Sequence, residues 1–201
     1  MTLERMEYVI MKIKEVSNIL MVGQVVSRVE AKKDSESIGK TISILIPKAI
    51  EDGKINHSNL NKIQLKSEVD EKKLTQEGDI ILKLNQPYDA AYISKDDEGI
   101  LITSHCLVIR DIKKYIDPKY LLAFINSEMY KEQAMDSASG ALIPMLTKKK
   151  IEEIDVPMVY EDQQKKIVAL FENINKQQAV FDEIIRLEKM KLENILRGGE
   201  V

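Results

Sequence analysis

Residues 160–197 read YEDQQKKIVALFENINKQQAVFDEIIRLEKMKLENILR and contain neither proline nor glycine, the residues that most often end a helix. The pair Gly198–Gly199 follows directly. This pattern predicts one continuous helix from Tyr160 to Arg197, ended by the two glycines. At a rise of about 1.5 Å per residue, such a helix extends for roughly 57 Å.

Apolar side chains recur in this helix at positions alternately four and three residues apart, the spacing of a coiled-coil seam. Nine positions have this spacing, and seven of them are apolar: Ile167, Phe171, Ile174, Gln178, Phe181, Ile185, Glu188, Leu192 and Ile195. A compact domain of this size cannot bury so long a seam, so we expect it to form the interface of a homodimer. Gln178 and Glu188 interrupt it, and polar seam positions of this kind fix register. The alternative is that the first half of the helix docks on the domain and only its end is free.

The composition is that of an ordinary folded protein, with 44% hydrophobic and 31% charged residues. The 201 residues suffice for one sizeable core with an appendage, or for two small domains. The single cysteine, Cys106, allows no internal disulfide and fits a reducing compartment. No secretory signal begins the sequence and no apolar run is long enough to span a bilayer, so we expect a cytoplasmic protein.

The net charge is −3, from 30 Lys and Arg against 33 Asp and Glu. A protein that holds a polyanion unaided usually has a basic face or a high pI. Any nucleic-acid interface must therefore rest on local basic patches, or on a partner that supplies positive charge.

Short strand patterns and polar turns fill the chain before the long helix. We expect a short helix or strand within 6–22, and strands at 41–46, 77–84 and 98–110. A helix should begin at Asp117–Pro118 and fade near Met135, followed by a small-residue loop at 136–144. A capped turn then leads to a short strand ending near Pro157. The pattern predicts an α+β protein, with a mixed α/β domain over residues 1–158 and the coiled-coil helix over 159–201.

The stretch KLNQPYDAAY, residues 83–92, raises the question of an enzyme. Asn-x-Pro-Tyr after an apolar strand resembles the catalytic loop of amino-methyltransferases. Those enzymes need a glycine-rich turn for S-adenosylmethionine, whereas the eight glycines here form no Gly-x-Gly. Gln86 also stands where the enzyme loop has its first proline or equivalent. The sequence therefore favours a protein that is not an enzyme and binds no cofactor.

The two histidines, His57 and His105, form no ligand pair with spaced Cys, Asp or Glu residues. His105 and Cys106 are neighbours in an apolar strand pattern, where adjacent side chains point to opposite faces. We therefore expect Cys106 to be buried and His105 to face outward, where it could touch a ligand. No catalytic residue and no metal site is expected.

Four blocks of the sequence occur in a recognisable order: LTQEGDIILKLNQPYDAAYI, GILITSHCLVIR, IDPKYLLAFINSE and GALIPMLTKKKIEEIDVPMVYEDQQKKIVALFENIN. In this order they resemble the specificity subunit of type I restriction–modification systems, over roughly Lys12–Leu196. The last block is the most specific. It carries Gly140, Ile143 and Leu146, then Val156–Pro157, then Glu161–Asp162–Gln163 before the long helix.

The resemblance implies a non-catalytic subunit that reads double-stranded DNA. In that family a mixed α/β domain sits on the duplex, and long helices space two such domains and bind modification (methyltransferase) subunits; a restriction subunit can join them. The family's usual chain has two recognition domains and two helices, whereas this chain has one of each. We therefore expect two copies to pair with antiparallel helices and to read two inverted copies of one half-site.

The candidate DNA contacts fall into two groups and an isolated residue. Amides suit adenine edges and aromatic rings can pack on sugar or thymine methyl groups, and phosphates attract basic residues. The loop group is Lys83, Asn85, Gln86, Tyr88 and Tyr92; the basic group is Arg28, Lys32, Lys33 and Lys40; His105 is the isolated residue.

Each of these groups has a simpler interpretation. The two tyrosines could serve domain packing, and Glu30, Asp34 and Glu36 make the basic stretch compatible with a solvated loop. Lysines 148–150 are typical of a solvated face. A coiled-coil interaction protein without DNA binding is therefore the competing class, favoured by the acidic composition and the seam.

Overall fold

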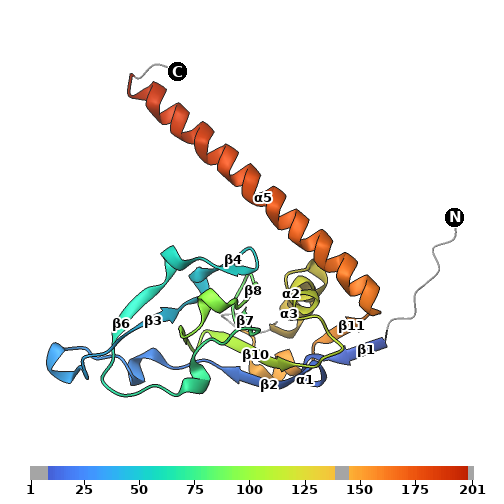
Figure 1. Ribbon diagram of the computed structural model, residues 1–201, viewed down its shortest axis with the longest axis horizontal. Helices are drawn as coiled ribbons and strands as arrows, with labels where there is room; N and C mark the ends of the chain where they lie inside the picture. The colour runs from blue at the N-terminus through green and yellow to red at the C-terminus, as the bar shows by residue number, and fades with distance from the viewer. Residues whose placement is uncertain (1–8, 139–144, 199–201) are drawn as a thin grey trace.

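The computed structural model describes residues 9–138 and 145–198, as a sheet-rich domain from which one long helix rises (Figure 1). The strands are β1 (Val9–Lys12), β2 (Ser17–Val22), β3 (Thr41–Leu45), β4 (Ile50–Glu51), β5 (Lys54–Ile55), β6 (Asn61–Gln64), β7 (Ile80–Lys83), β8 (Ala90–Tyr92), β9 (Leu101–Ile102), β10 (Cys106–Ile112) and β11 (Asp155–Met158). The α-helices are α1 (Ile13–Val16), α2 (Pro118–Ile125), α3 (Glu128–Ala138), α4 (Lys148–Glu152) and α5 (Glu161–Leu196).

An antiparallel sheet in the order β2-β10-β7-β8 forms the centre of the domain. Alternate residues of β7 face opposite cores, because side chains alternate along a strand. Ile80 and Leu82 join the cluster that contains α2, whereas Ile81 joins a second cluster with Val108 and Cys106. The sheet is therefore covered on both faces, which explains why β7 reads as an unbroken apolar run rather than an alternating one.

A smaller sheet in the order β6-β3-β9 has its own cluster around Ile44, Ile63 and Leu101. It lies at the end of the domain away from the start of α5 (Figure 1). The pairing of β3 with β9 is parallel, with Leu45 opposite Ile102. Because β9 leads directly towards β10, one short turn connects the two sheets.

The single strand expected at 98–110 is wrong, because the chain turns at Thr103–His105 and changes sheet. Before the turn, β9 pairs with β3; after it, β10 pairs with β2 and β7. The Cys106 amide donates to the Thr103 carbonyl at 3.0 Å, which closes the turn. The expected strands at 41–46 and 77–84 correspond to β3 and β7, and 6–22 contains β1, α1 and β2.

The single helix expected from residue 117 to about 135 is also wrong, since α2 and α3 are separate. The start is as predicted: the Asp117 side chain accepts from the Lys119 amide and Pro118 is the first helical residue. Asn126 ends α2 because its side chain both donates to and accepts from the backbone of Ala90, at 3.1 and 3.0 Å. That contact is tertiary and leaves no mark in the local sequence. Of the loop expected at 136–144, residues 136–138 instead belong to α3, and residues 139–144 lie outside the described residues.

The two ends of the domain lie side by side, because β1 pairs antiparallel with β11, with Lys12 opposite Asp155. As expected, a capped turn (Thr147 accepting from Lys150) and a short strand precede the long helix. The predicted domain boundary at 158 falls at the end of β11. The predicted helix is present as α5, and Gly198 follows it with φ +83°; Gly199 lies outside the described residues.

The first half of α5 docks on the domain through Gln164, the residue of the helix that is most deeply buried. Its side-chain oxygen accepts from the Asp117 amide at 2.8 Å, and its nitrogen donates to Val159 and Tyr115 carbonyls. Further along, Lys119 pairs with Glu172 at 2.6 Å. Residues 176–198 are all exposed, so the structure matches the alternative in which only the end of the helix is free.

Candidate nucleic-acid interface

Three loop segments converge at one end of the central sheet. They follow β2 at Gly23–Gln24, follow β7 at Leu84, and precede β10 at Thr103–His105. The Leu84 amide donates to the His105 carbonyl at 3.0 Å, and the Ser104 amide donates to the Gln24 carbonyl at 2.8 Å. This end of the sheet, called the convergent edge below, therefore consists of backbone held in place by main-chain hydrogen bonds.

Gly23 permits the closest approach within the convergent edge. A Cβ atom added at this position would lie 2.2 Å from the Thr103 carbonyl oxygen and 2.4 Å from that of Ile102. Both are backbone atoms that cannot move aside, so a side chain at residue 23 would push the segments apart. Glycine here positions Gln24 against the turn before β10.

The loop after β7 contributes exposed amide side chains to the convergent edge. Asn85, Gln86 and Pro87 are exposed. Backbone pairing of Asn85 with Met145, and a 2.7 Å hydrogen bond from Leu146 to Leu84, hold the loop from the other side. Leu146 of the last sequence block therefore lies against this loop, whereas Gly140 and Ile143 of that block lie outside the described residues.

Tyr88 does not reach the surface with these amides. Its side chain is 1% exposed and belongs to the α2 core, and burial raises its pKa. Its backbone has φ +62°, so the loop turns sharply after Pro87 and directs the ring inward. The packing interpretation therefore holds for Tyr88, and the expectation of a DNA contact from its ring is corrected.

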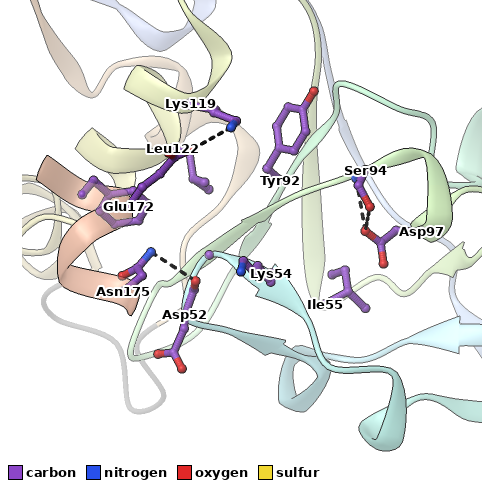
Figure 2. A pocket seen from close by; sticks show the side chains of 12 residues that line it. Asp52, Lys54, Ile55, Tyr92, Ser94, Asp97, Lys119, Leu122, Glu172 and Asn175 are labelled. Atoms are coloured by element: carbon purple, nitrogen blue, oxygen red, sulfur yellow. Dashed lines mark hydrogen bonds and ion pairs between the residues drawn. The ribbon is translucent and has the colours of Figure 1, made fainter. Parts of the chain in front are cut away.

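Tyr92 lies at the other end of the sheet. It pairs with Ile80, the first residue of β7, whereas the convergent edge begins after Lys83, the last. There it lines a pocket of about 360 Å³ below the point where α5 leaves the domain, beside Lys119 and Leu122 (Figure 2). The sequence-predicted loop group is therefore divided between two sites.

Lys83 is buried rather than free for a phosphate. It is 8% exposed and pairs with Asp89 at 3.2 Å, and Lys131 of α3 pairs with the same carboxylate at 3.3 Å. Lys83 is thus a structural residue, which corrects the expectation of a DNA contact. Lys131 was missed by sequence reasoning, because only the tertiary fold brings α3 next to this loop.

His105 is exposed at the convergent edge and Cys106 is fully buried, as predicted, but the reason differs: His105 lies on the turn before β10 and not within a strand. Burial raises the pKa of the Cys106 thiol to about 12, so it is not a nucleophile at neutral pH. The convergent edge thus presents three of the predicted side chains together, Asn85, Gln86 and His105. Gln24 and Ser104 flank them and carry no sequence signal of their own.

The basic group is exposed and starts close to the convergent edge. The short 3-10 helix η1 (Val26–Arg28) begins two residues after Gln24, so Arg28 follows the edge directly in the chain. Lys32 and Lys33 are also exposed. Lys40 forms an exposed ion pair with Glu68 at 2.5 Å, so its charge is partly balanced.

Ser94 and Asp97 line the pocket under α5, and His57 lies beside Asp97, but the three residues are not arranged as a catalytic triad. The Ser94 hydroxyl donates to Asp97 (Figure 2). His57 binds the other oxygen of the same carboxylate, with 2.6 Å between Nε2 and Oδ1. A triad requires histidine between serine and carboxylate to take the serine proton. Within residues 9–138 and 145–198, no cluster of three His, Cys, Asp or Glu residues could hold a metal ion.

None of the helices in the described parts of the chain has the length and apolar character needed to cross a membrane.

The structure is thus a sheet-rich domain with exposed amide and imidazole groups at one end of its central sheet and one long helix at its C-terminal side. The chain belongs to the family of type I restriction modification DNA specificity domains, whose model matches residues 6–196. Specificity subunits of these systems are non-catalytic, so the family assignment also confirms that the Asn-x-Pro-Tyr stretch is no methyltransferase loop.

Solved structures support the fold. The HsdS subunit from Thermoanaerobacter tengcongensis superimposes with a TM-score of 0.60 and 19% identity, over 92% of this chain and 45% of that one. A chain from a study of type I R-M complex assembly and conformational transition gives the same values. The S subunit of a type I system from M. genitalium superimposes with a TM-score of 0.56 and 11% identity, over 94% of this chain and 45% of that one. The chain thus spans less than half the length of these relatives. No curated protein sequence matches it significantly.

Proposed function

We propose that the chain reads a short DNA sequence for a type I restriction–modification system, with its convergent edge against the bases. The observation that carries this proposal is the exposure of Asn85, Gln86 and His105 together on one hydrogen-bonded edge. Side chains that read bases must be held firmly, and a sheet end joined by main-chain hydrogen bonds meets that need.

The chemistry of the edge suits the major groove. An asparagine or glutamine amide can both donate to and accept from an adenine edge, and a single well-placed pair discriminates against the wrong base by about 1–3 kcal/mol. Arg28, Lys32 and Lys33 are the residues that would hold phosphates, which position the protein without reading sequence. Because the chain is net negative, methyltransferase subunits would supply much of the remaining phosphate contact.

The exposed end of α5 supports a second part of the proposal, homodimerisation. Phe181, Ile185 and Leu192 are each more than half exposed in the single chain. Burying them against a second copy would remove apolar surface from water and place two reading domains at the ends of an antiparallel helix pair. A closed dimer has two-fold symmetry, so its DNA target would be two inverted half-sites separated by a spacer. The same helices would recruit modification subunits.

Titration of a labelled random-sequence duplex pool, with and without a co-purified modification subunit, tests this function. Repeated selection should enrich two inverted copies of one short sequence at a fixed spacing. Binding should weaken steeply as salt increases, because phosphate contacts release counterions. If no salt-sensitive binding occurs under either condition, the DNA-reading proposal is wrong.

That negative result would favour the competing function, a coiled-coil interaction protein without DNA binding. The observations in its favour are the net charge of −3 and the apolar free end of α5. Co-purification from the native host separates the two functions, because a methyltransferase partner is expected only for the DNA-reading protein.

A further inference from the structure

Helix α5 has a docking face and a free face, and Phe171 lies at the border between them. Gln164, Val168 and Asn175 contact the domain. With 3.6 residues per turn, Ile167 and Ile174 project from the side of α5, about 70° and 90° from the docking face, and are exposed. Phe171 is partly buried against the α2 core, close enough to Gly53 that an added Cβ would touch its ring at 3.4 Å.

The seam from Phe171 to Ile195 is self-complementary about the level of Glu183. Two antiparallel helices can be aligned so that residue 183 of one copy lies level with residue 183 of the other. The facing pairs are then Phe171–Ile195, Ile174–Leu192, Gln178–Glu188 and Phe181–Ile185. Two-fold symmetry repeats each pair, so every apolar residue meets an apolar residue. The two polar residues meet each other.

Other registers lack this match. A shift by one heptad in either direction places Gln178 opposite Phe181 or Ile195, and Glu188 opposite Phe171 or Ile185. A parallel pair in register instead faces Glu188 with Glu188 and so buries like charges together. A buried polar group without a partner is costly, whereas an amide can donate to a carboxylate. The seam therefore selects one orientation and one register.

We propose that two copies of the chain pair through α5 in this single antiparallel register, with the two-fold axis at the level of Glu183. The proposal rests on the homodimer of the proposed function and specifies its geometry. The Gln178 amide donates to Asp182 of its own helix at 2.9 Å and retains a second N–H, which is available to a partner across the seam. That second donor faces Glu188 of the second copy.

The end layers connect the helix pair to the reading domains. Ile195 of the second copy packs on Phe171, and Phe171 in turn packs against the α2 core of its own domain. Each domain thus contacts the far end of the other copy's helix through one aromatic ring. This contact restrains how each reading domain is oriented on the stalk.

Cysteine cross-linking of the full chain tests the register. Gln178→Cys and Glu188→Cys are produced in one cell with different tags, and the purified protein is treated with a short thiol-reactive cross-linker. The native Cys106 is fully buried and stays silent. We expect cross-linked dimers that carry both tags. Either variant alone should give only background, because two copies of position 178 lie ten residues apart along the pair, about 15 Å.

Glu183→Cys is the matched control, since it lies at the level of the axis but on the outer side of the helix, and it should not cross-link. Cross-linking of Gln178→Cys with itself would overturn the proposal in favour of a parallel pair. A dimer by sedimentation without mixed cross-links would overturn the register and leave the homodimer intact. A monomer at all concentrations would overturn both the register and the homodimer.

Discussion

Arg110 forms a bidentate ion pair with the buried carboxylate of Asp79, with Nε 2.7 Å from Oδ1 and Nη2 2.6 Å from Oδ2. The same guanidinium donates to the backbone carbonyls of Lys72 and Leu74. The pair therefore ties β10 to the segment that leads into β7. This segment lies at the end of the strands opposite the convergent edge. The ion pair acts together with main-chain hydrogen bonds that hold the same segment, such as that from the Thr75 amide to the Ile100 carbonyl at 2.9 Å.

Asp79→Ala should lower the free energy of unfolding by about 3–5 kcal/mol, because it leaves the Arg110 charge buried without a partner. The control is Glu68→Ala, which breaks the exposed pair with Lys40 and should cost at most about 1 kcal/mol. Urea denaturation at one protein concentration measures both. Equal decreases in the two variants would show that the Asp79 pair contributes no more than a surface pair.

Phe181→Glu combined with Ile185→Glu should give a monomer that no longer binds a split DNA site. The two substitutions place four carboxylates in the central layers of the proposed helix pair. Val180→Glu with Leu187→Glu is the control, because these residues are equally exposed but lie off the seam. Analytical ultracentrifugation distinguishes the outcomes. If the Phe181 and Ile185 variant still sediments as a dimer, the seam is not the interface.

Substitutions at the convergent edge should separate base reading from phosphate binding. Asn85→Ala should relax sequence preference at one position of the half-site, at a cost of about 1–3 kcal/mol. Lys32→Ala with Lys33→Ala should weaken binding to all sequences alike and reduce the salt slope by about one for each phosphate that is no longer neutralised. Competition binding at several salt concentrations checks both. A uniform weakening from Asn85→Ala would remove this side chain from base reading.

Cys106 should make unfolding easier at high pH. Burial raises its pKa from 9.0 to about 12, so the folded thiol stays protonated where the unfolded thiol ionises. The unfolded chain then binds fewer protons, and the free energy of unfolding should fall as pH rises between about 9 and 12. Cys106→Ala should reduce this slope in pH-dependent denaturation. An unchanged slope would assign it to other groups.

A seven-residue insertion that repeats one heptad of α5 near Glu183 should lengthen the DNA spacer. Seven residues add about 10.5 Å of helix to the pair, and this distance corresponds to about three base pairs at roughly 3.4 Å each. An insertion of four residues is the control, since it breaks the heptad phase and should abolish the dimer. Sequencing of selected duplexes reads the spacer. An unchanged spacer after the seven-residue insertion would mean that α5 does not set it.

Features that depend on local chemistry were predictable from the sequence. The Asp117–Pro118 start of α2 follows from capping, and the uninterrupted α5 follows from helix propensity. Each involves only residues close in the chain, so the signal is present in a single sequence.

Features set by contacts between distant segments could not be predicted in this way. β10 separates from β9 because the two halves pair with different sheets, and α2 ends at Asn126 because of Ala90. A tyrosine in this loop could equally pack in the core or contact DNA, and the sequence does not distinguish the two. The positive φ of Tyr88, which accompanies the inward direction of its ring, is visible only in the structure. For the candidate site, the sequence identified Asn85, Gln86 and His105, but the register of the sheet was needed to bring them together.

The pairing of β1 with β11 places the first and last strands of the domain next to each other, at the root of the stalk. A unit whose two ends meet can be exchanged as a cassette: residues 9–158 could be replaced by another domain of the same topology without altering α5. Under the proposed function, recombination at this pair of strands would exchange the reading domain and leave the length of α5 unchanged.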